Sequence, residues 1–100
     1  MRLSQQYIDI IINIARHQFG SDASVWLFGS RLDDARRGGD IDLLVEVRHP
    51  VENKPREAAR FAAAIQWRLG DQKIDVIIDD GSHHQPIHDV ARQNGKELRC

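Results

Sequence analysis

The sequence predicts an α/β (α+β) fold, a small mixed sheet with flanking helices. Two observations support this prediction. Short apolar and β-branched runs alternate along the chain with longer segments whose apolar residues recur at helical spacing. The length of 100 residues and the apolar content of 41% suit one small domain with a single core. We therefore expect residues 1–100 to form one domain, with too few strands for a barrel or a full dinucleotide-binding sheet.

The first helix is predicted to run from Ser4, whose hydroxyl can cap it, to about Phe19, before Gly20. Its apolar residues recur at helical spacing: Ile8, Ile11, Ile12, Ala15 and Phe19. The β-branched and aromatic run from Ser24 to Phe28 predicts a strand. Residues 31–39 are polar and end in two glycines, which predicts a loop with at most a single helical turn.

A second strand is predicted from Ile41 to Val47, and its mostly apolar composition favours a central place in the sheet. The second helix is expected to open at Asn53 or Lys54, with Pro55 in its first turn, and to end at Gly70. Its predicted buried stripe comprises Ala58, Phe61, Ala62, Ile65 and Leu69.

The last third of the chain predicts a strand from Lys73 to Ile78, a polar turn over 79–85, and a short helix from Pro86 to about Gln93. Residues 96–99 are compatible with an added edge strand. The predicted order is thus helix, strand, loop, strand, helix, strand, helix, and this last short strand.

Charge and cysteine content narrow the classes of partner and compartment. The net charge is −1, so no broad basic field favours binding to nucleic acid or to an anionic membrane. The only cysteine, Cys100, excludes a disulfide within the chain and a Cys-based zinc site, and it fits a reducing compartment. The N-terminal apolar run is too short and polar to span a bilayer. We expect a cytoplasmic protein without direct nucleic-acid or membrane contacts.

Two aspartates stand at the head of the second predicted strand. Because side chains alternate along a strand, Asp40 and Asp42 fall on one face and the apolar residues between and after them on the other. Two carboxylates this close repel unless a cation compensates them. Mg²⁺ prefers such oxygen ligands and usually retains water and substrate phosphate oxygens as well.

A third carboxylate lies in the last predicted strand, where Asp75 points away from Ile74 and Val76. We expect an unpaired charge there to be costly. If this strand pairs beside the second strand, Asp75 joins Asp40 and Asp42. Three convergent aspartates suit a two-metal site, with ions roughly 4 Å apart, for displacement at phosphorus.

The Gly29-Ser30 pair ends the first strand and indicates an anion site. A glycine lets backbone N–H groups approach a ligand closely, and successive N–H groups form an anion-binding nest. The Ser30 hydroxyl can donate to a phosphate oxygen, and Arg31 lies beside it.

The segment from Phe28 to Val47 resembles the signature of the DNA polymerase beta-like nucleotidyltransferase superfamily: Gly-Ser, a spacer, then Asp-x-Asp. Here nine residues separate Ser30 from Asp40, within the family's range. More closely, the chain is similar to the minimal nucleotidyltransferases (MNT proteins), stand-alone catalytic domains usually encoded beside a helical HEPN protein. The resemblance covers nearly the whole chain. One departure is Gly39, where many relatives carry serine.

The resemblance implies a role for each motif residue. Gly29 and Ser30 would bind the β- and γ-phosphates of a nucleotide, with Arg31 as a further phosphate contact. Asp40 and Asp42 would bind two Mg²⁺ ions. Asp75 would share one metal and help to deprotonate the acceptor hydroxyl as a general base.

The activity so implied is Mg²⁺-dependent transfer of a nucleoside monophosphate, preferably AMP from ATP, to a hydroxyl. A HEPN toxin would complete the site and supply a tyrosine acceptor, and this chain would be its antitoxin. The alternative is a binding module that neutralises the toxin by occlusion with little chemistry. Modification of a small molecule such as an aminoglycoside, or polymerase activity, is less favoured. A homodimer and a hetero-oligomer both stay open.

Other residues have simpler interpretations. Asp40 and Asp42 taken alone would suit a solvated strand end, and Asp75 an exposed edge-strand carboxylate paired with Lys73. The spacing of His83, His84 and His88 matches no standard zinc set, so we interpret them as a surface turn.

The two tryptophans are also open to more than one interpretation. Trp26 suits the core better than a base-stacking role. Trp67 lies off the buried stripe of its helix, on a line with Ala59 and Ala63, which indicates a two-sided buried helix or a partner surface.

Overall fold

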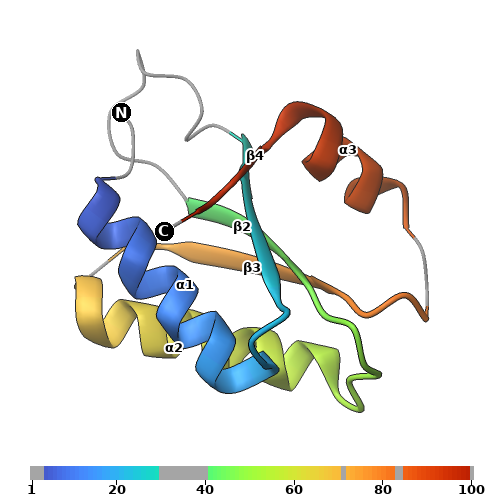
Figure 1. Cartoon of the computed structure of the whole chain (residues 1–100), viewed down its shortest axis with the longest axis horizontal. Coiled ribbons are helices and arrows are strands. Elements are labelled where there is room, and N and C mark those ends of the chain that lie inside the picture. The colour runs from blue at the N-terminus through green and yellow to red at the C-terminus, as the bar shows by residue number, and fades with distance from the viewer. Residues whose placement is uncertain (1–3, 30–40, 71, 83–84, 100) are drawn as a thin grey trace.

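The computed structural model describes residues 4–29, 41–70, 72–82 and 85–99 (Figure 1). Its elements are α1 (Gln5–Phe19), β1 (Ser24–Phe28), β2 (Ile41–Glu46), α2 (Lys54–Leu69), β3 (Ile74–Asp79), α3 (Pro86–Asn94) and β4 (Lys96–Glu97). This order confirms the predicted α/β architecture. None of the helices in these ranges is long and apolar enough to cross a bilayer.

The sheet has the strand order β3-β2-β1-β4. β2 pairs with β1 in the antiparallel sense and with β3 in the parallel sense, so the predicted central place of this strand is confirmed. β4 pairs with the outer side of β1, as an edge strand. The parallel pair β2 and β3 is connected by α2, which packs against β3.

Helix ends follow the capping chemistry of the sequence. The Ser4 hydroxyl accepts the N–H of Tyr7 at 3.1 Å, and the Asn53 side chain accepts the N–H of Arg56 at 3.2 Å. At its other end α1 stops at Gly20, whose backbone φ of 109° is open to glycine and strained for other residues. The predicted helix limits are therefore confirmed to within a residue.

α1 and α2 cover one face of the sheet, on the lower side in Figure 1. Phe61 and Ile65 of α2 are fully buried there, and the rings of Phe19 and Phe61 meet edge to face with centroids 5.6 Å apart. Burial of each such side chain contributes about 1.5–3 kcal/mol. The core cluster consists of Ile11, Ile12, Ala15, Phe19, Val25, Leu27, Ile41, Leu43, Val45, Val47, Phe61, Ile65, Ile74, Ile78 and Leu98.

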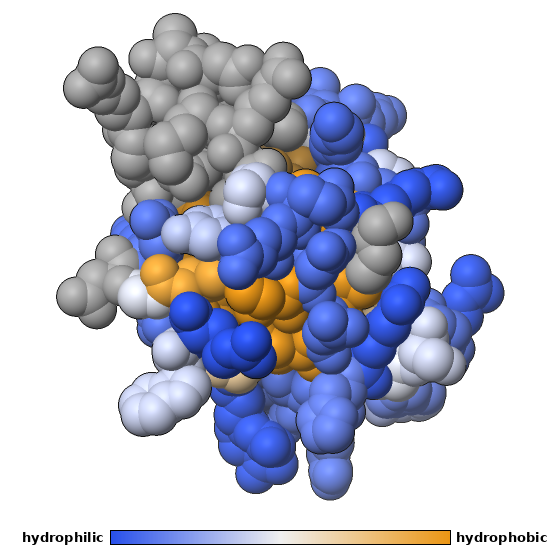
Figure 2. Space-filling model, turned by 60° about the vertical axis from the view of Figure 1, so that its left-hand side comes forward, coloured by the Kyte–Doolittle hydropathy of each residue, from blue (hydrophilic) through white to orange (hydrophobic). Residues whose placement is uncertain are grey.

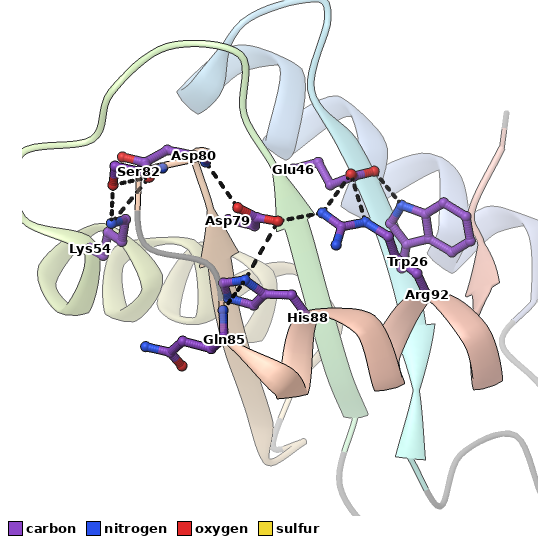
Figure 3. A network of polar contacts seen from close by, with 10 residues as sticks. Trp26, Glu46, Lys54, Asp79, Asp80, Ser82, Gln85, His88 and Arg92 are labelled. Carbon is purple, nitrogen blue, oxygen red and sulfur yellow. Dashed lines mark hydrogen bonds and ion pairs between the residues drawn. The ribbon is translucent and has the colours of Figure 1, made fainter.

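The opposite face carries three rows of side chains that run across β1, β2 and β3. The register sets them, in strand order, as Phe28, Asp42 and Asp75; Trp26, Leu44 and Ile77; and Ser24, Glu46 and Asp79. We name them the Asp42, Leu44 and Glu46 rows. α3 lies over this face (Figures 1 and 3). Leu44 beneath it is fully buried, as is Ala91 of α3.

The predicted polar turn after β3 is wrong at its first residue. Asp79 belongs to the strand and is buried, because the backbone pairing continues to its carbonyl, which accepts the N–H of Val47 at 2.9 Å. Two strand limits also shift by one residue, since β2 ends at Glu46 and β3 begins at Ile74. His88 is likewise not a surface-turn residue: it lies in α3 and is only 2% exposed.

Asp80 fastens the end of β3 to the connector that precedes α2. Its carboxylate accepts the N–H of Val51 at 2.7 Å and the hydroxyl of Ser82 at 2.6 Å, and it pairs with Lys54 at 3.1 Å. The hydrogen bonds from Ser82 and Val51 hold the pKa of Asp80 well below its usual range. The predicted turn thus has a side chain that ties two distant segments together.

Gly95 follows α3 and lies close to the backbone of both α3 and β1. A Cβ at this residue would lie 2.1 Å from the carbonyl oxygen of Ala91 and 2.8 Å from that of Leu27. Both neighbours are backbone atoms, so no change of side-chain rotamer can relieve the clash.

We therefore expect Gly95→Ala to destabilise the domain by about 1–3 kcal/mol, the usual cost of overpacking. Urea unfolding followed by circular dichroism measures the effect, with Gln93→Ala on the exposed side of α3 as control. Equal midpoints for the two variants would contradict the contact.

Candidate active site

The Asp42 row brings two of the predicted site residues together. Asp42 on β2 and Asp75 on β3 are direct register partners on neighbouring parallel strands, and Phe28 on β1 is the partner of Asp42 on its other side. Paired strands lie about 4.8 Å apart, so the two carboxylates start from adjacent points on one face. The pairing of these two strands, on which the sequence analysis made the placement of Asp75 depend, is present in the structure.

Gly29 supplies the space that Asp42 occupies. Its backbone φ is 78°, and a Cβ built on it would lie 2.1 Å from Oδ2 of Asp42. The sequence suggested that this glycine exposes backbone N–H groups to a ligand. The structure adds a second reason, since a side chain at residue 29 would collide with the carboxylate.

Ser30, Arg31 and Asp40 lie outside the described residues, so their predicted roles stay predictions. Among the described residues, no group of three or more His, Cys, Asp or Glu side chains could hold a metal ion. Of the three predicted carboxylates, the structure therefore describes Asp42 and Asp75.

Asp75 is exposed on the edge strand β3. The expectation that its charge would be costly there is wrong, because water can solvate the carboxylate. Exposure serves the predicted chemistry better than burial, since an acceptor group must be able to reach a general base.

The donor set fits a hard divalent cation. Two carboxylates side by side, one half-buried and one exposed, offer oxygen ligands while leaving open positions toward solvent. Asp42 and Asp75 would hold such an ion between β2 and β3, and the absence of a side chain at Gly29 leaves room for the Asp42 carboxylate.

A second carboxylate pair stands four residues further along the same two strands, in the Glu46 row (Figure 3). Here Arg92 of α3 supplies the counter-charge. Its Nε donates to Glu46 Oε2 at 2.8 Å, and its Nη2 forms a very short contact with Asp79 Oδ2. Trp26 Nε1 donates to the other oxygen of Glu46 at 2.7 Å. The protein itself therefore supplies a positive charge and hydrogen-bond donors to this pair.

The electrostatics of this network follow from the same contacts. Burial raises the pKa of Asp79, but the hydrogen bonds from Arg92 and from the Gly81 N–H outweigh it and hold that pKa below its ordinary value. Burial lowers the pKa of Arg92, and its bonds to Asp79 and Glu46 reverse the effect and raise it. Asp79 and Arg92 are thus both charged at neutral pH.

His88 caps the N-terminal end of α3, next to this network. Its Nδ1 accepts the N–H of Gln85 at 3.3 Å and lies 3.5 Å from Asp79 Oδ2 (Figure 3). Sequence reasoning rejected His88 as a zinc ligand, interpreted it as part of a surface turn, and did not foresee Arg92. The available signal was the spacing of His88 and Arg92, which places both side chains on one flank of a helix.

Comparison with known families identifies a match over most of the chain. The model of the nucleotidyltransferase domain matches residues 8–96. The chain belongs to this family. The nucleotidyltransferase domain is similar in fold to a chain in the solved structure of a tri-AMPylated Shewanella oneidensis HEPN toxin in complex with MNT antitoxin. The TM-score is 0.71 at 23% identity, over 96% of this chain and 72% of that one. Among curated protein sequences nothing matches.

We expect Gly29→Ala to lower nucleotide transfer by about tenfold or more, because a displaced carboxylate loses its geometry. The matched control is Gly70→Ala, which has a similar φ of 91° but nothing within 4 Å of the added Cβ. The two variants share the backbone strain, about 1–3 kcal/mol, so thermal melts should show similar losses. Equal activity of both variants would contradict a role for the Gly29–Asp42 contact.

The Arg92–Asp79 pair should make stability depend on pH. Because the folded pKa of Asp79 lies below the unfolded value of about 3.9, its stabilisation is present above that value and is lost as pH falls through the folded pKa.

We therefore expect Arg92→Met to cost about 1–3 kcal/mol at pH 7 and progressively less below about pH 4. Urea unfolding between pH 3 and pH 7 measures this difference. The control is Arg99→Met, which removes an exposed pair with Glu97 and should cost under about 1 kcal/mol. A cost for Arg92→Met that is constant with pH would contradict the assignment.

Proposed function

We propose that this chain is a protein nucleotidyltransferase that transfers AMP from ATP to a tyrosine hydroxyl of a helical HEPN-type partner, and that it acts as an antitoxin in the cytoplasm. The observation that carries the proposal is the Asp42–Asp75 register pair with Gly29 beneath the Asp42 carboxylate. The family match supports nucleotide chemistry, and the fold likeness to a chain of an AMPylated toxin complex supports the substrate class.

In this proposal the hydroxyl oxygen of the acceptor attacks the α-phosphorus of ATP. The new O–P bond forms as the bond to the bridging oxygen breaks, and pyrophosphate leaves. Asp75 takes the proton from the attacking hydroxyl, and its exposure on β3 leaves it open to an acceptor from solvent. Bound Mg²⁺ ions would supply charge neutralisation at the attacking and leaving oxygens.

The other residues position the reactants. Asp42, together with Asp40, would provide the carboxylate oxygens that hold the ions. Gly29, Ser30 and Arg31 would hold the phosphates of the nucleotide. Catalysis of this kind rests on orientation and on charges placed where the transition state needs them.

The test is a label-transfer assay with the chain and the protein encoded beside it. With Mg²⁺ and ATP labelled at the α-phosphate, we expect label on a tyrosine of the partner. Asp42→Asn and Asp75→Asn should each lower the label by at least about a hundredfold, whereas Glu52→Gln, an exposed carboxylate on the connector before α2, should leave it unchanged.

Complex formation is measured in parallel for each variant. A stable complex that blocks the toxin equally well in the wild type and in Asp42→Asn, without label in either, would contradict the proposal and favour neutralisation by occlusion. Label that survives both aspartate substitutions would refute the assigned site.

A further inference from the structure

Two apolar side chains of α3 are exposed, although the helix packs on the sheet. Ile87 is 36% exposed and Val90 46%. His88 and Ala91 of the same helix are buried, so they define the direction in which α3 faces the sheet. Because successive residues of a helix are about 100° apart, Ile87 and Arg92 lie about 70° to either side of this direction. These two side chains are therefore on opposite flanks of α3.

The flank that carries Ile87 faces the Asp42 row. Arg92 pairs with both carboxylates of the Glu46 row, so its own flank faces that row (Figure 3). The Asp42 row lies four residues nearer the start of β2 and β3, on the other side of the helix. Ile87 therefore faces this second row, and Val90 lies further round the same flank, toward solvent.

α3 crosses the strands from β3 to β1. At its start, His88 Nδ1 lies 3.5 Å from Asp79 Oδ2 on β3. After its end, a Cβ at Gly95 would lie 2.8 Å from the carbonyl oxygen of Leu27 on β1. Ile87 directly precedes His88, so it lies at the β3 end of the helix.

Ile77 of β3 extends this apolar surface toward Asp75. The side chains of Asp75, Ile77 and Asp79 share one face of β3, and Ile77 lies about 6.6 Å along the strand from Asp75. Ile77 is half-buried, whereas Asp75 is exposed. We name Ile77, Ile87 and Val90 the apolar shelf. The shelf borders the carboxylate of Asp75 on the side of α3.

We infer that the apolar shelf holds the aromatic ring of the acceptor tyrosine while the tyrosine hydroxyl meets Asp75. The inference rests on the proposed function, in which Asp75 takes the proton from that hydroxyl. A tyrosine combines an apolar ring with a hydroxyl at its tip, so the ring can lie on aliphatic side chains while the hydroxyl reaches the carboxylate. In serine and threonine the hydroxyl is on Cβ, and no apolar body is left for the shelf. The shelf thus favours tyrosine as the acceptor.

The order of the strands leaves this end of the Asp42 row to the acceptor. Gly29 directly follows Phe28, so it lies on the β1 side of Asp42, whereas Asp75 lies on the β3 side. In the proposed site the phosphates of the nucleotide bind at Gly29. The acceptor then approaches from the edge strand β3. This order agrees with displacement at phosphorus, in which the attacking and leaving oxygens are roughly in line.

Apolar surface on the other side of the molecule does not adjoin the Asp42 row. Figure 2, which brings the left-hand side of Figure 1 forward, shows apolar surface surrounded by hydrophilic side chains there. Trp67 of α2 is 89% exposed, so the interpretation of α2 as a two-sided buried helix is wrong. α1 and α2 cover the opposite sheet face (Figure 1). Of the exposed large apolar side chains in the described ranges, only Ile87 and Val90 share the sheet face of Asp75.

Label transfer to the partner protein, with Mg²⁺ and ATP labelled at the α-phosphate, tests the inference. Ile87→Gln keeps the length of the side chain but makes it polar. We expect it to lower kcat/KM for the partner by about tenfold and to leave KM for ATP within about twofold of the wild type. Ile87→Leu stays apolar and should retain the wild-type kcat/KM. The control is Gln93→Ala, exposed on α3 away from the sheet, which should also change neither constant.

Two results would overturn the inference and leave the proposed function standing. Equal kcat/KM for the partner in the wild type and in Ile87→Gln would show that no ring lies on the shelf. A raised KM for ATP in Ile87→Gln, with kcat/KM for the partner unchanged, would assign the shelf to the nucleobase instead. A wild-type chain that labels no partner contradicts the proposed function itself, and the inference then fails with it.

Discussion

The ion pair between Arg92 and the carboxylates of Glu46 and Asp79 holds the second face of the sheet together. Arg92 comes from α3, and its two partners come from β2 and β3, so one guanidinium connects three elements (Figure 3). It thus helps to hold the short helix over the buried Leu44, together with the packing of Ala91. Removing either side would leave a poorly solvated charge, which costs more than the pair itself contributes.

The carboxylates of this face form two pairs, and only one of these pairs lies against α3. The Glu46 row faces the flank of α3 that carries His88 and Arg92, and the protein supplies its counter-charge. The Asp42 row lies beyond the helix, at the start of β2 and β3, where Asp75 is exposed. The same spacing on the same two strands thus yields a structural pair at one end and a pair suited to an external cation at the other.

Much of the fold could be predicted from local chemistry. Ser4 and Asn53 cap helices, Gly20 and Gly70 end them, and apolar periodicity fixes their buried sides, all within a few residues of chain. The Glu46–Arg92 bond joins residues 46 apart in sequence, and no local pattern indicates it. Asp79 was placed in a turn because it opens the polar run over residues 79–85. A carboxylate rarely enters a buried strand without a partner, and here only the fold supplies one.

For the candidate site, alternation placed Asp42 on the correct face, but its register with Asp75 depends on how two strands pack under α2. Gly29 was identified for its backbone alone, because the room it leaves for Asp42 appears only once β1 and β2 are paired.

One face of β2 contributes to the core, and the other carries the candidate site residue Asp42. Leu43 and Val45 face α1 and α2 in the core, whereas Asp42 faces outward and takes no part in it. A lineage can therefore exchange the carboxylates for neutral residues and still inherit a folded domain with its outer surfaces unchanged. A chain that lost its activity in this way would keep its surfaces for binding. An enzyme of this fold can therefore become an inactive binding protein without any change in its core.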